Sequence, residues 1–104
     1  MTMYAVSIKL TSQVLNKYNL NDDAAFNLIT HFLTGQGFKE ERQGYYIGSA
    51  STNAVTTMLA IQRLNKAYEW LQQATSDIQM LRIEEINSLM PLLTPQTVKK
   101  LAYA

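Results

Sequence analysis

The sequence contains no cysteine and only one histidine, His31, among its 104 residues. Without cysteine, the chain can form no disulfide and can hold neither a thiolate-bound metal nor a cysteine nucleophile. It also lacks any stretch near the roughly 18 consecutive apolar residues of a membrane-spanning helix. The N-terminus shows no basic start followed by an apolar run, as a secretion signal would. We therefore expect a cytoplasmic protein with no membrane segment.

An excess of charge is absent as well. Nine Lys and Arg residues stand against eight Asp and Glu residues, which gives a formal net charge of +1. Nucleic-acid-binding proteins usually carry a basic excess, because neutralising phosphates supplies much of their affinity. Any contact with RNA is therefore expected to be local or governed by shape.

What the chain does have is a high apolar content, 47%, with only 16% charged residues. These values indicate a folded chain rather than a disordered one. The length fits one domain. Because so short a chain buries a modest fraction of its surface alone, dimerisation would help to stabilise it.

The apolar pattern predicts six elements in the order strand, helix, strand, strand, helix, strand. Polar residues 11–21 are expected to connect the first two. The elements are a strand at Tyr4–Leu10, a helix capped near Asn21 and ended by Gly35, strands at Phe38–Arg42 and Tyr45–Gly48, a helix from about Ala54 to Leu71, and a strand at Asp77–Ile83. This order is the split βαβ arrangement of an α+β, ferredoxin-like fold: a four-stranded antiparallel sheet with both helices on one face.

A C-terminal extension follows the fourth strand. We expect residues 1–93 to form the domain and residues 94–104 a short tail, in which Thr94-Pro95 can begin a helix. The apolar residues around Pro91 leave two alternatives. This segment either folds back on its own domain or crosses to a second subunit and pairs with the edge of that sheet.

Several short motifs occur together in an order that is known from one family. They are Met3-Tyr4-Ala5-Val6-Ser7-Ile8, Gly37-Phe38, Gln43-Gly44, Tyr68-Glu69-Trp70, and Ser76-Asp77-Ile78 followed by Leu81-Arg82-Ile83-Glu84. On these motifs the chain resembles the virulence-associated protein D (VapD) family across roughly Met3 to Leu93. The resemblance implies a ferredoxin-like homodimer, similar to the small CRISPR-associated nucleases. It also implies an endoribonuclease, often in a toxin–antitoxin setting with a protein antitoxin as partner.

The polar positions depart from the family pattern. Typical members carry Asp at the end of the first strand, where this chain has Lys9, and Ser after Gln-Gly, where it has Tyr45. The later family Tyr falls at Ile47, and the Arg residues that usually flank the Asp77 position are missing. A carboxylate at position 9 could bind a divalent cation or polarise a water molecule, whereas an ammonium group does neither well.

Seven residues are candidates for chemistry. Asp77, Tyr45 and Ser49 are the predicted catalytic residues, while Lys9, Tyr46, Arg42 and Arg82 are predicted to contact RNA. Lysine can hold a phosphate as a point charge, and an exposed strand tyrosine can stack on a base. Each can also be explained without a function. Lys9, Arg42 and Arg82 can be solvated surface charges, Asp77 can cap a turn or pair with a lysine, and strand tyrosines can pack in the core.

Helical phase places His31 on a solvent-facing side with no carboxylate fixed beside it, so a surface position is expected rather than a catalytic one. No metal site and no cofactor are predicted, although a divalent metal such as magnesium would suit a nuclease.

Two functions from different classes follow. The first is a VapD-like endoribonuclease, acting as a homodimeric toxin or RNA-level regulator. The alternative is a catalytically inactive VapD-like dimer that serves as an RNA-binding or protein-interaction module, which the lysine at position 9 and the near-zero net charge favour. A small-molecule-binding regulator on the same fold stays open, because a fold does not fix a function.

Overall fold

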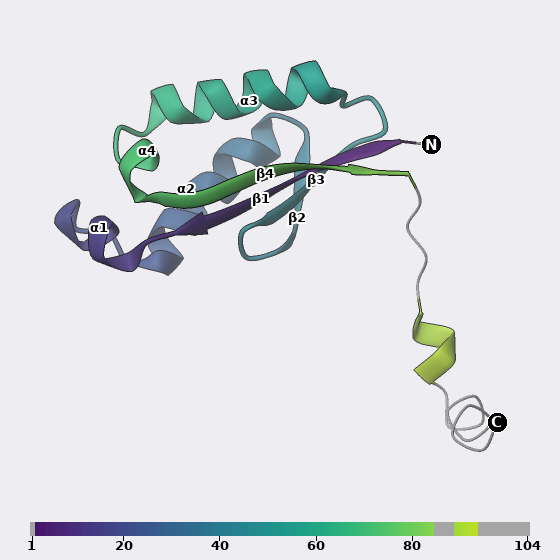
Figure 1. Cartoon of the computed structure of the whole chain (residues 1–104), viewed down its shortest axis with the longest axis horizontal. Coiled ribbons are helices and arrows are strands. Elements are labelled where there is room, and N and C mark those ends of the chain that lie inside the picture. The colour runs from purple at the N-terminus through teal and green to yellow at the C-terminus, as the bar shows by residue number, and fades with distance from the viewer. Residues whose placement is uncertain (1, 85–88, 94–104) are drawn as a thin grey trace.

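The computed structural model describes residues 2–84 and 89–93, and its centre is one antiparallel sheet (Figure 1). The strand order is β2-β3-β1-β4, and each neighbouring pair is antiparallel. β1 and β2 therefore run parallel to each other with β3 between them, as the split βαβ arrangement requires. The four strands are β1 (Met3–Leu10), β2 (Phe38–Arg42), β3 (Tyr45–Gly48) and β4 (Thr75–Ile83). The predicted ferredoxin-like α+β fold is confirmed.

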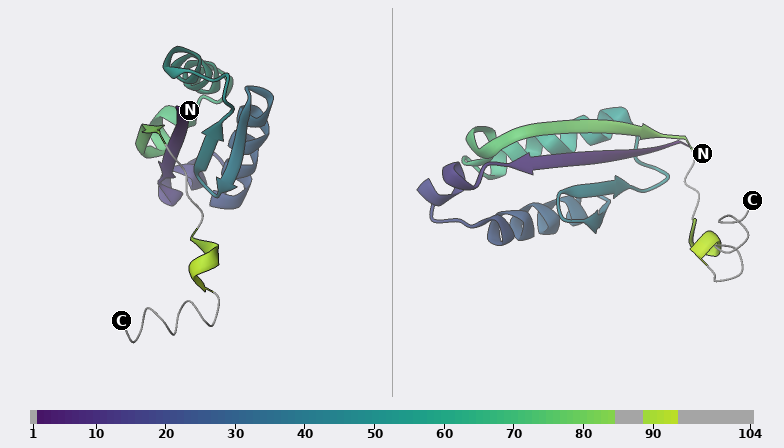
Figure 2. Two further views of the ribbon diagram at one scale, coloured as in Figure 1. Left: turned by 90° about the vertical axis from the view of Figure 1, so that its right-hand side faces the viewer. Right: turned by 60° about the horizontal axis from the view of Figure 1, so that its bottom comes forward.

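Two long helices, α2 (Asp22–Gly35) and α3 (Ala54–Ala67), pack on the same side of the sheet (Figure 2). Both begin at an asparagine cap, of which the one near Asn21 was predicted. The Asn21 side chain accepts a hydrogen bond from the Ala24 N–H at 2.7 Å, and Asn53 forms a reciprocal capping box with Thr56. Each cap satisfies N–H groups that have no partner inside the helix.

The core lies between these helices and the sheet. Val6 and Tyr46 are register partners on β1 and β3, so their side chains share a face, and both are almost completely buried. They pack with apolar residues of both helices: Ile29 and Leu33 from α2, Ala60 and Leu64 from α3.

Two short helices were not predicted. Residues 11–21 were expected to be a simple connection, and that prediction was wrong, because α1 (Ser12–Lys17) forms there and buries Leu15 completely. Likewise, the helix expected to reach Leu71 ends at Ala67, and a separate turn, α4 (Leu71–Ala74), follows it. The Thr11 N–H donates to the Ala74 carbonyl at 2.7 Å, and this hydrogen bond links the start of α1 to the end of α4.

Beyond β4, the described chain resumes at Leu89 and forms a single 3-10 turn, η1 (Met90–Leu93). The terminal helix predicted from Thr94 lies outside the described residues. Among the described residues, no helix is long and apolar enough to cross a membrane.

Candidate active site

The face of the sheet opposite α2 and α3, which we call the open face, carries three of the seven predicted site residues, namely Lys9, Tyr45 and Asp77. Val6, Ile8 and Tyr46 point toward the helices, so their strand neighbours must point the other way. The register then assigns ten side chains of β1, β3 and β4 to the open face: Met3, Ala5, Ser7, Lys9, Tyr45, Ile47, Asp77, Gln79, Leu81 and Ile83.

These ten side chains separate into two groups along the strands. Lys9 lies directly opposite Asp77, and Ser7 has both Tyr45 and Gln79 as register partners. We call these five residues the polar half of the open face. The Lys9 backbone carbonyl also accepts a hydrogen bond from the Ser76 hydroxyl at 3.2 Å, which fixes the start of β4 beside β1.

The other five side chains, Met3, Ala5, Ile47, Leu81 and Ile83, form the apolar half. Ala5 pairs with both Ile47 and Leu81, and these two larger side chains bury it completely. The open face therefore changes from charged and hydroxyl-bearing to apolar within one strand length.

Arg42 joins the polar half from the edge of the sheet. Its guanidinium carbon lies 5.0 Å from the centre of the Tyr45 ring, within the range of a cation–π interaction. This contact holds a positive charge over an aromatic face that is itself partly exposed. A planar cation and an aromatic ring in this arrangement can together bind a phosphate and an unpaired base.

Tyr46 has a different environment from the one predicted for it. The side chain is fully buried, so its ring offers no face to a base, and the predicted RNA contact is not available to it. Thr30 donates its hydroxyl proton to Glu40 at 2.6 Å, so the Tyr46 hydroxyl donates to the Thr30 oxygen at 2.9 Å. Burial raises the pKa of Tyr46 above its ordinary value, which keeps the phenol neutral and suits a structural role between α2 and β3.

Ser49 and Arg82 lie apart from the polar half. Ser49 follows the far end of β3, level with Met3, and its hydroxyl bonds to the hydroxyls of Ser51 and Thr52 at 2.9 and 3.1 Å. At about 3.3 Å per strand residue, it is roughly 20 Å from Asp77. Arg82 pairs with Glu84 at 2.7 Å and is exposed to solvent. The predicted catalytic trio is thus not assembled within one chain.

The polar half does not fit a divalent cation. Asp77 is its single carboxylate, and the residue opposite it is a lysine, whose charge opposes a bound cation. No group of three or more His, Cys, Asp or Glu side chains in the described part of the chain could hold a metal ion. His31, as expected, is exposed on α2.

Two neighbours of the predicted residues, Ser7 and Gln79, were not assigned to the site. Strand alternation was the signal that could have found them, since each lies two residues from Lys9 or Asp77 and therefore shares its face.

No family model matches the sequence, but two curated proteins do. Endoribonuclease VapD 2 of Riemerella anatipestifer is 36% identical over 94 residues, which covers 88% of this chain and 100% of that protein. The Endoribonuclease VapD homolog of Helicobacter pylori (strain ATCC 700392 / 26695) is 35% identical over 91 residues, 88% of this chain and 96% of the relative. The chain belongs to the VapD family.

Membership confirms the resemblance that the short motifs indicated. It also allows position 9 of the polar half to be compared with the family pattern. By the resemblance, typical VapD proteins carry a carboxylate at the end of the first strand, whereas this chain has Lys9 at that position. In this VapD protein, a carboxylate is supplied on the polar half by Asp77 of the neighbouring strand.

Proposed function

We propose that this VapD protein is an endoribonuclease that acts at the polar half of its open face. The observation that carries the proposal is the 36% identity, over 88% of the chain, with a protein named Endoribonuclease VapD 2. The placement of Asp77 opposite Lys9 supports it, because a carboxylate and an ammonium group side by side can serve acid–base chemistry on a phosphodiester.

In the proposed reaction, the carboxylate of Asp77 accepts the proton of a ribose 2′-hydroxyl. The 2′-oxygen then attacks the adjacent phosphorus, the bond to the 5′-oxygen breaks, and water supplies the proton to that oxygen. Lys9 offsets the negative charge that the phosphate gains in the transition state. The products are a 2′,3′-cyclic phosphate and a 5′-hydroxyl, and no step requires a metal.

Tyr45 and Arg42 are assigned to RNA binding in this proposal. Tyr45 is separated from Asp77 by β1 and by two residues along the strands, about 12 Å between Cα atoms at ordinary sheet spacings. That distance suits a base stacked next to the scissile phosphate better than a proton donor at it. The guanidinium of Arg42, 5.0 Å above the ring, would meet the neighbouring phosphate.

The activity is tested by incubating the purified protein with a mixed RNA pool, with magnesium and with a chelator. Cleavage is expected in both conditions, and the new ends should carry cyclic phosphates, because the polar half holds only one carboxylate. Cleavage only with magnesium would contradict the metal-independent mechanism.

The alternative, an RNA-binding protein without nuclease activity, is favoured by the lysine at position 9. It predicts salt-dependent retention of RNA with no new ends in either condition. If neither cleavage nor retention is observed, both proposals that involve RNA are excluded.

We also propose that two copies join through the apolar half of the open face to form a homodimer. The dimer acts in the cytoplasm as a toxin, with a protein antitoxin as its partner, or as an RNA-level regulator. Support comes from the half-buried Ile47, Leu81 and Ile83, which one chain leaves uncovered. Joining two copies there would leave both polar halves accessible.

Light scattering at micromolar concentration should therefore give the mass of two chains. A Leu81→Glu variant should give the mass of one chain with an unchanged far-ultraviolet spectrum, because a carboxylate cannot be buried unpaired at an apolar interface. A wild-type monomer at that concentration would contradict the dimer.

A further inference from the structure

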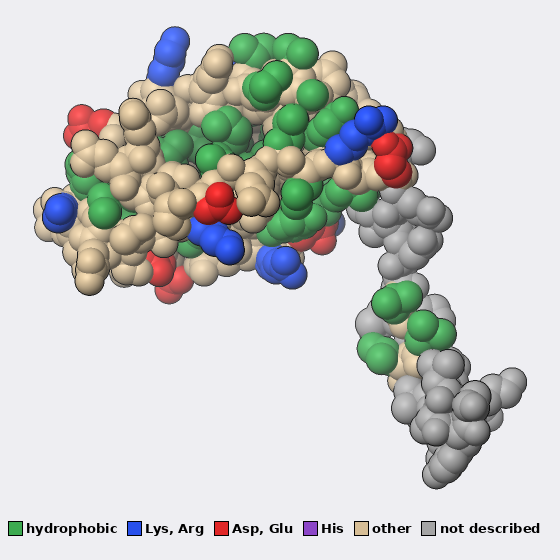
Figure 3. Space-filling view, in the orientation of Figure 1, with side chains coloured by type: hydrophobic (Ala, Val, Ile, Leu, Met, Phe, Trp, Pro, Cys, Tyr) green, Lys and Arg blue, Asp and Glu red, His purple; other side chains and the backbone are tan. Residues whose placement is uncertain are grey.

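The described chain has eight large apolar side chains that are exposed, and they gather in two places. Five lie on α3 and β4: Val55, Met58, Leu59, Ile78 and Met80. The other three, Leu89, Leu92 and Leu93, lie on or beside η1. In Figure 3 hydrophobic side chains gather over the upper part of the molecule, where Figure 1 places α3 and β4. A chain of this size seldom leaves two such apolar surfaces in water without a use for them.

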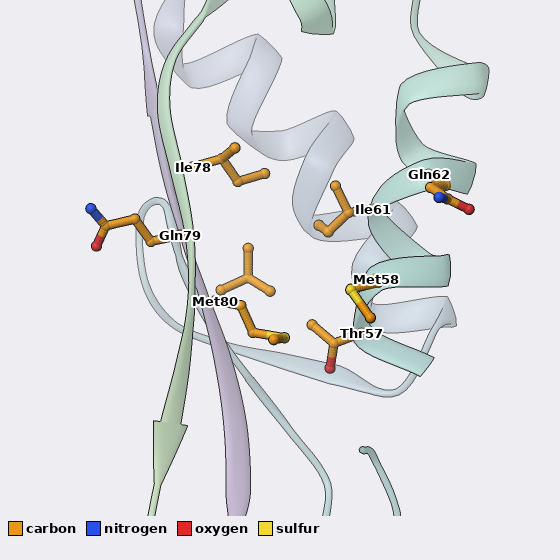
Figure 4. A pocket seen from close by; sticks show the side chains of 8 residues that line it. Thr57, Met58, Ile61, Gln62, Ile78, Gln79 and Met80 are labelled. Carbon is orange, nitrogen blue, oxygen red and sulfur yellow. The ribbon is translucent and has the colours of Figure 1, made fainter. Parts of the chain in front are cut away.

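A groove runs between α3 and β4 on the helix side of the sheet. The part next to Met58 and Met80 has a volume of about 320 Å³, and its continuation toward α4 has a volume of about 380 Å³. Ile78 and Met80 point into it from β4, while Met58 and Ile61 point into it from α3 (Figure 4). No charged side chain lines either part. The groove is open because β4 is the edge strand and α3 does not reach across it.

The residues of the C-terminal segment have the spacing that such a groove accepts. Leu89 lies just before the 3-10 turn η1, three residues before Leu92 and four before Leu93, and in an α-helical turn residues at this spacing share one side. Short helical segments commonly bind apolar grooves through anchors at this spacing. Leu89 and Leu93 are 66% and 67% exposed, so they are not packed against the domain in the conformation shown.

The distance along the chain is short enough for a domain to bind its own segment. Leu89 lies six positions after Ile83, the end of β4, and six residue steps span at most about 20 Å. The near end of the groove, at Met80, is only three strand residues from Ile83, roughly 10 Å. A tethered segment that can reach its site has an effective concentration in the millimolar range, which exceeds that of a second copy in dilute solution.

We propose that the C-terminal segment around Leu89–Leu93 docks into the α3–β4 groove of its own chain, with Leu92 against Met58 and Met80. Docking would remove both exposed apolar surfaces from water and would cover the edge of β4, which otherwise can pair with another chain. The inference is independent of the nuclease activity.

The absence of cysteine in the natural chain allows a direct test. A full-length double variant, Met58→Cys with Leu92→Cys, should form an intramolecular disulfide under mild oxidation at low micromolar concentration. The control pair, Glu41→Cys with Leu92→Cys, places the first cysteine on β2 at the opposite edge of the sheet. We expect the first pair to oxidise at least about tenfold faster than the control.

Non-reducing electrophoresis and peptide mass spectrometry distinguish the outcomes. A cross-linked monomer whose disulfide joins positions 58 and 92, formed at least about tenfold faster than the cross-linked monomer of the control pair, supports docking within one chain. Equal rates for the two pairs overturn the proposal. A cross-linked dimer overturns it too, because the segment would then occupy the groove of a second copy. Neither replaced side chain belongs to the core between the two long helices and the sheet, so the variant should still fold, which a cooperative thermal transition checks.

Discussion

Replacing Gly44 with alanine is expected to destabilise the domain by about 3 kcal/mol or more, a large part of the stability of a small domain. Gly44 has a φ of +82°, a conformation that residues with a Cβ adopt at a cost. In addition, an added Cβ would lie 2.6 Å from the backbone oxygen of Ile8 and 3.2 Å from the Phe26 ring. The Gly44 carbonyl accepts the Ile8 N–H at 2.8 Å, so the two segments cannot separate without breaking this bond.

Urea unfolding followed by circular dichroism measures the change, and Gly35→Ala is the matched control. Gly35 lies at the end of α2 with open space around its Cα and no positive φ, so alanine there should leave the stability equal or slightly raised. Similar midpoints for Gly44→Ala and the natural chain would show that the turn between β2 and β3 tolerates a side chain.

Features governed by local pattern could be predicted from the sequence. The alternation in Tyr4–Leu10, the caps at Asn21 and Asn53 and the turn at Gln43-Gly44 all act within a few residues, and the structure has each of them. The same alternation placed Lys9 and Ser7 on one side of β1.

Features that depend on packing between distant segments could not be predicted. The polar composition of residues 11–21 concealed Leu15, whose burial depends on α4, some sixty residues later in the chain. Strand alternation puts Tyr45 and Tyr46 on opposite faces, but it does not say which of them is buried; Tyr46 is, with its hydroxyl bonded to Thr30 of α2. Ser49 was assigned to the site by its position in the chain, and the strand register places it at the other end of the sheet.

The Asp77→Asn variant is expected to cleave RNA about a hundredfold more slowly than the natural protein, or slower still, because an amide cannot accept the 2′-hydroxyl proton. The substitution preserves the shape of the side chain. None of the hydrogen bonds and ion pairs that join described residues uses the Asp77 carboxylate, so the fold should be unaffected. Glu41→Gln, an equal loss of charge on the exposed β2 edge, is the matched control and should cleave normally.

In the Asp77→Asn variant, turnover should fall without a loss of RNA affinity, and this separates a catalytic role from a structural one. Removing a negative charge beside Lys9 makes the polar half more positive, so the affinity for RNA should stay equal or rise while kcat falls. A merely structural role would instead weaken binding and lower the melting temperature together. If Asp77→Asn cleaves as fast as the natural protein, the general base lies elsewhere, and the assignment of the polar half as the active site is wrong.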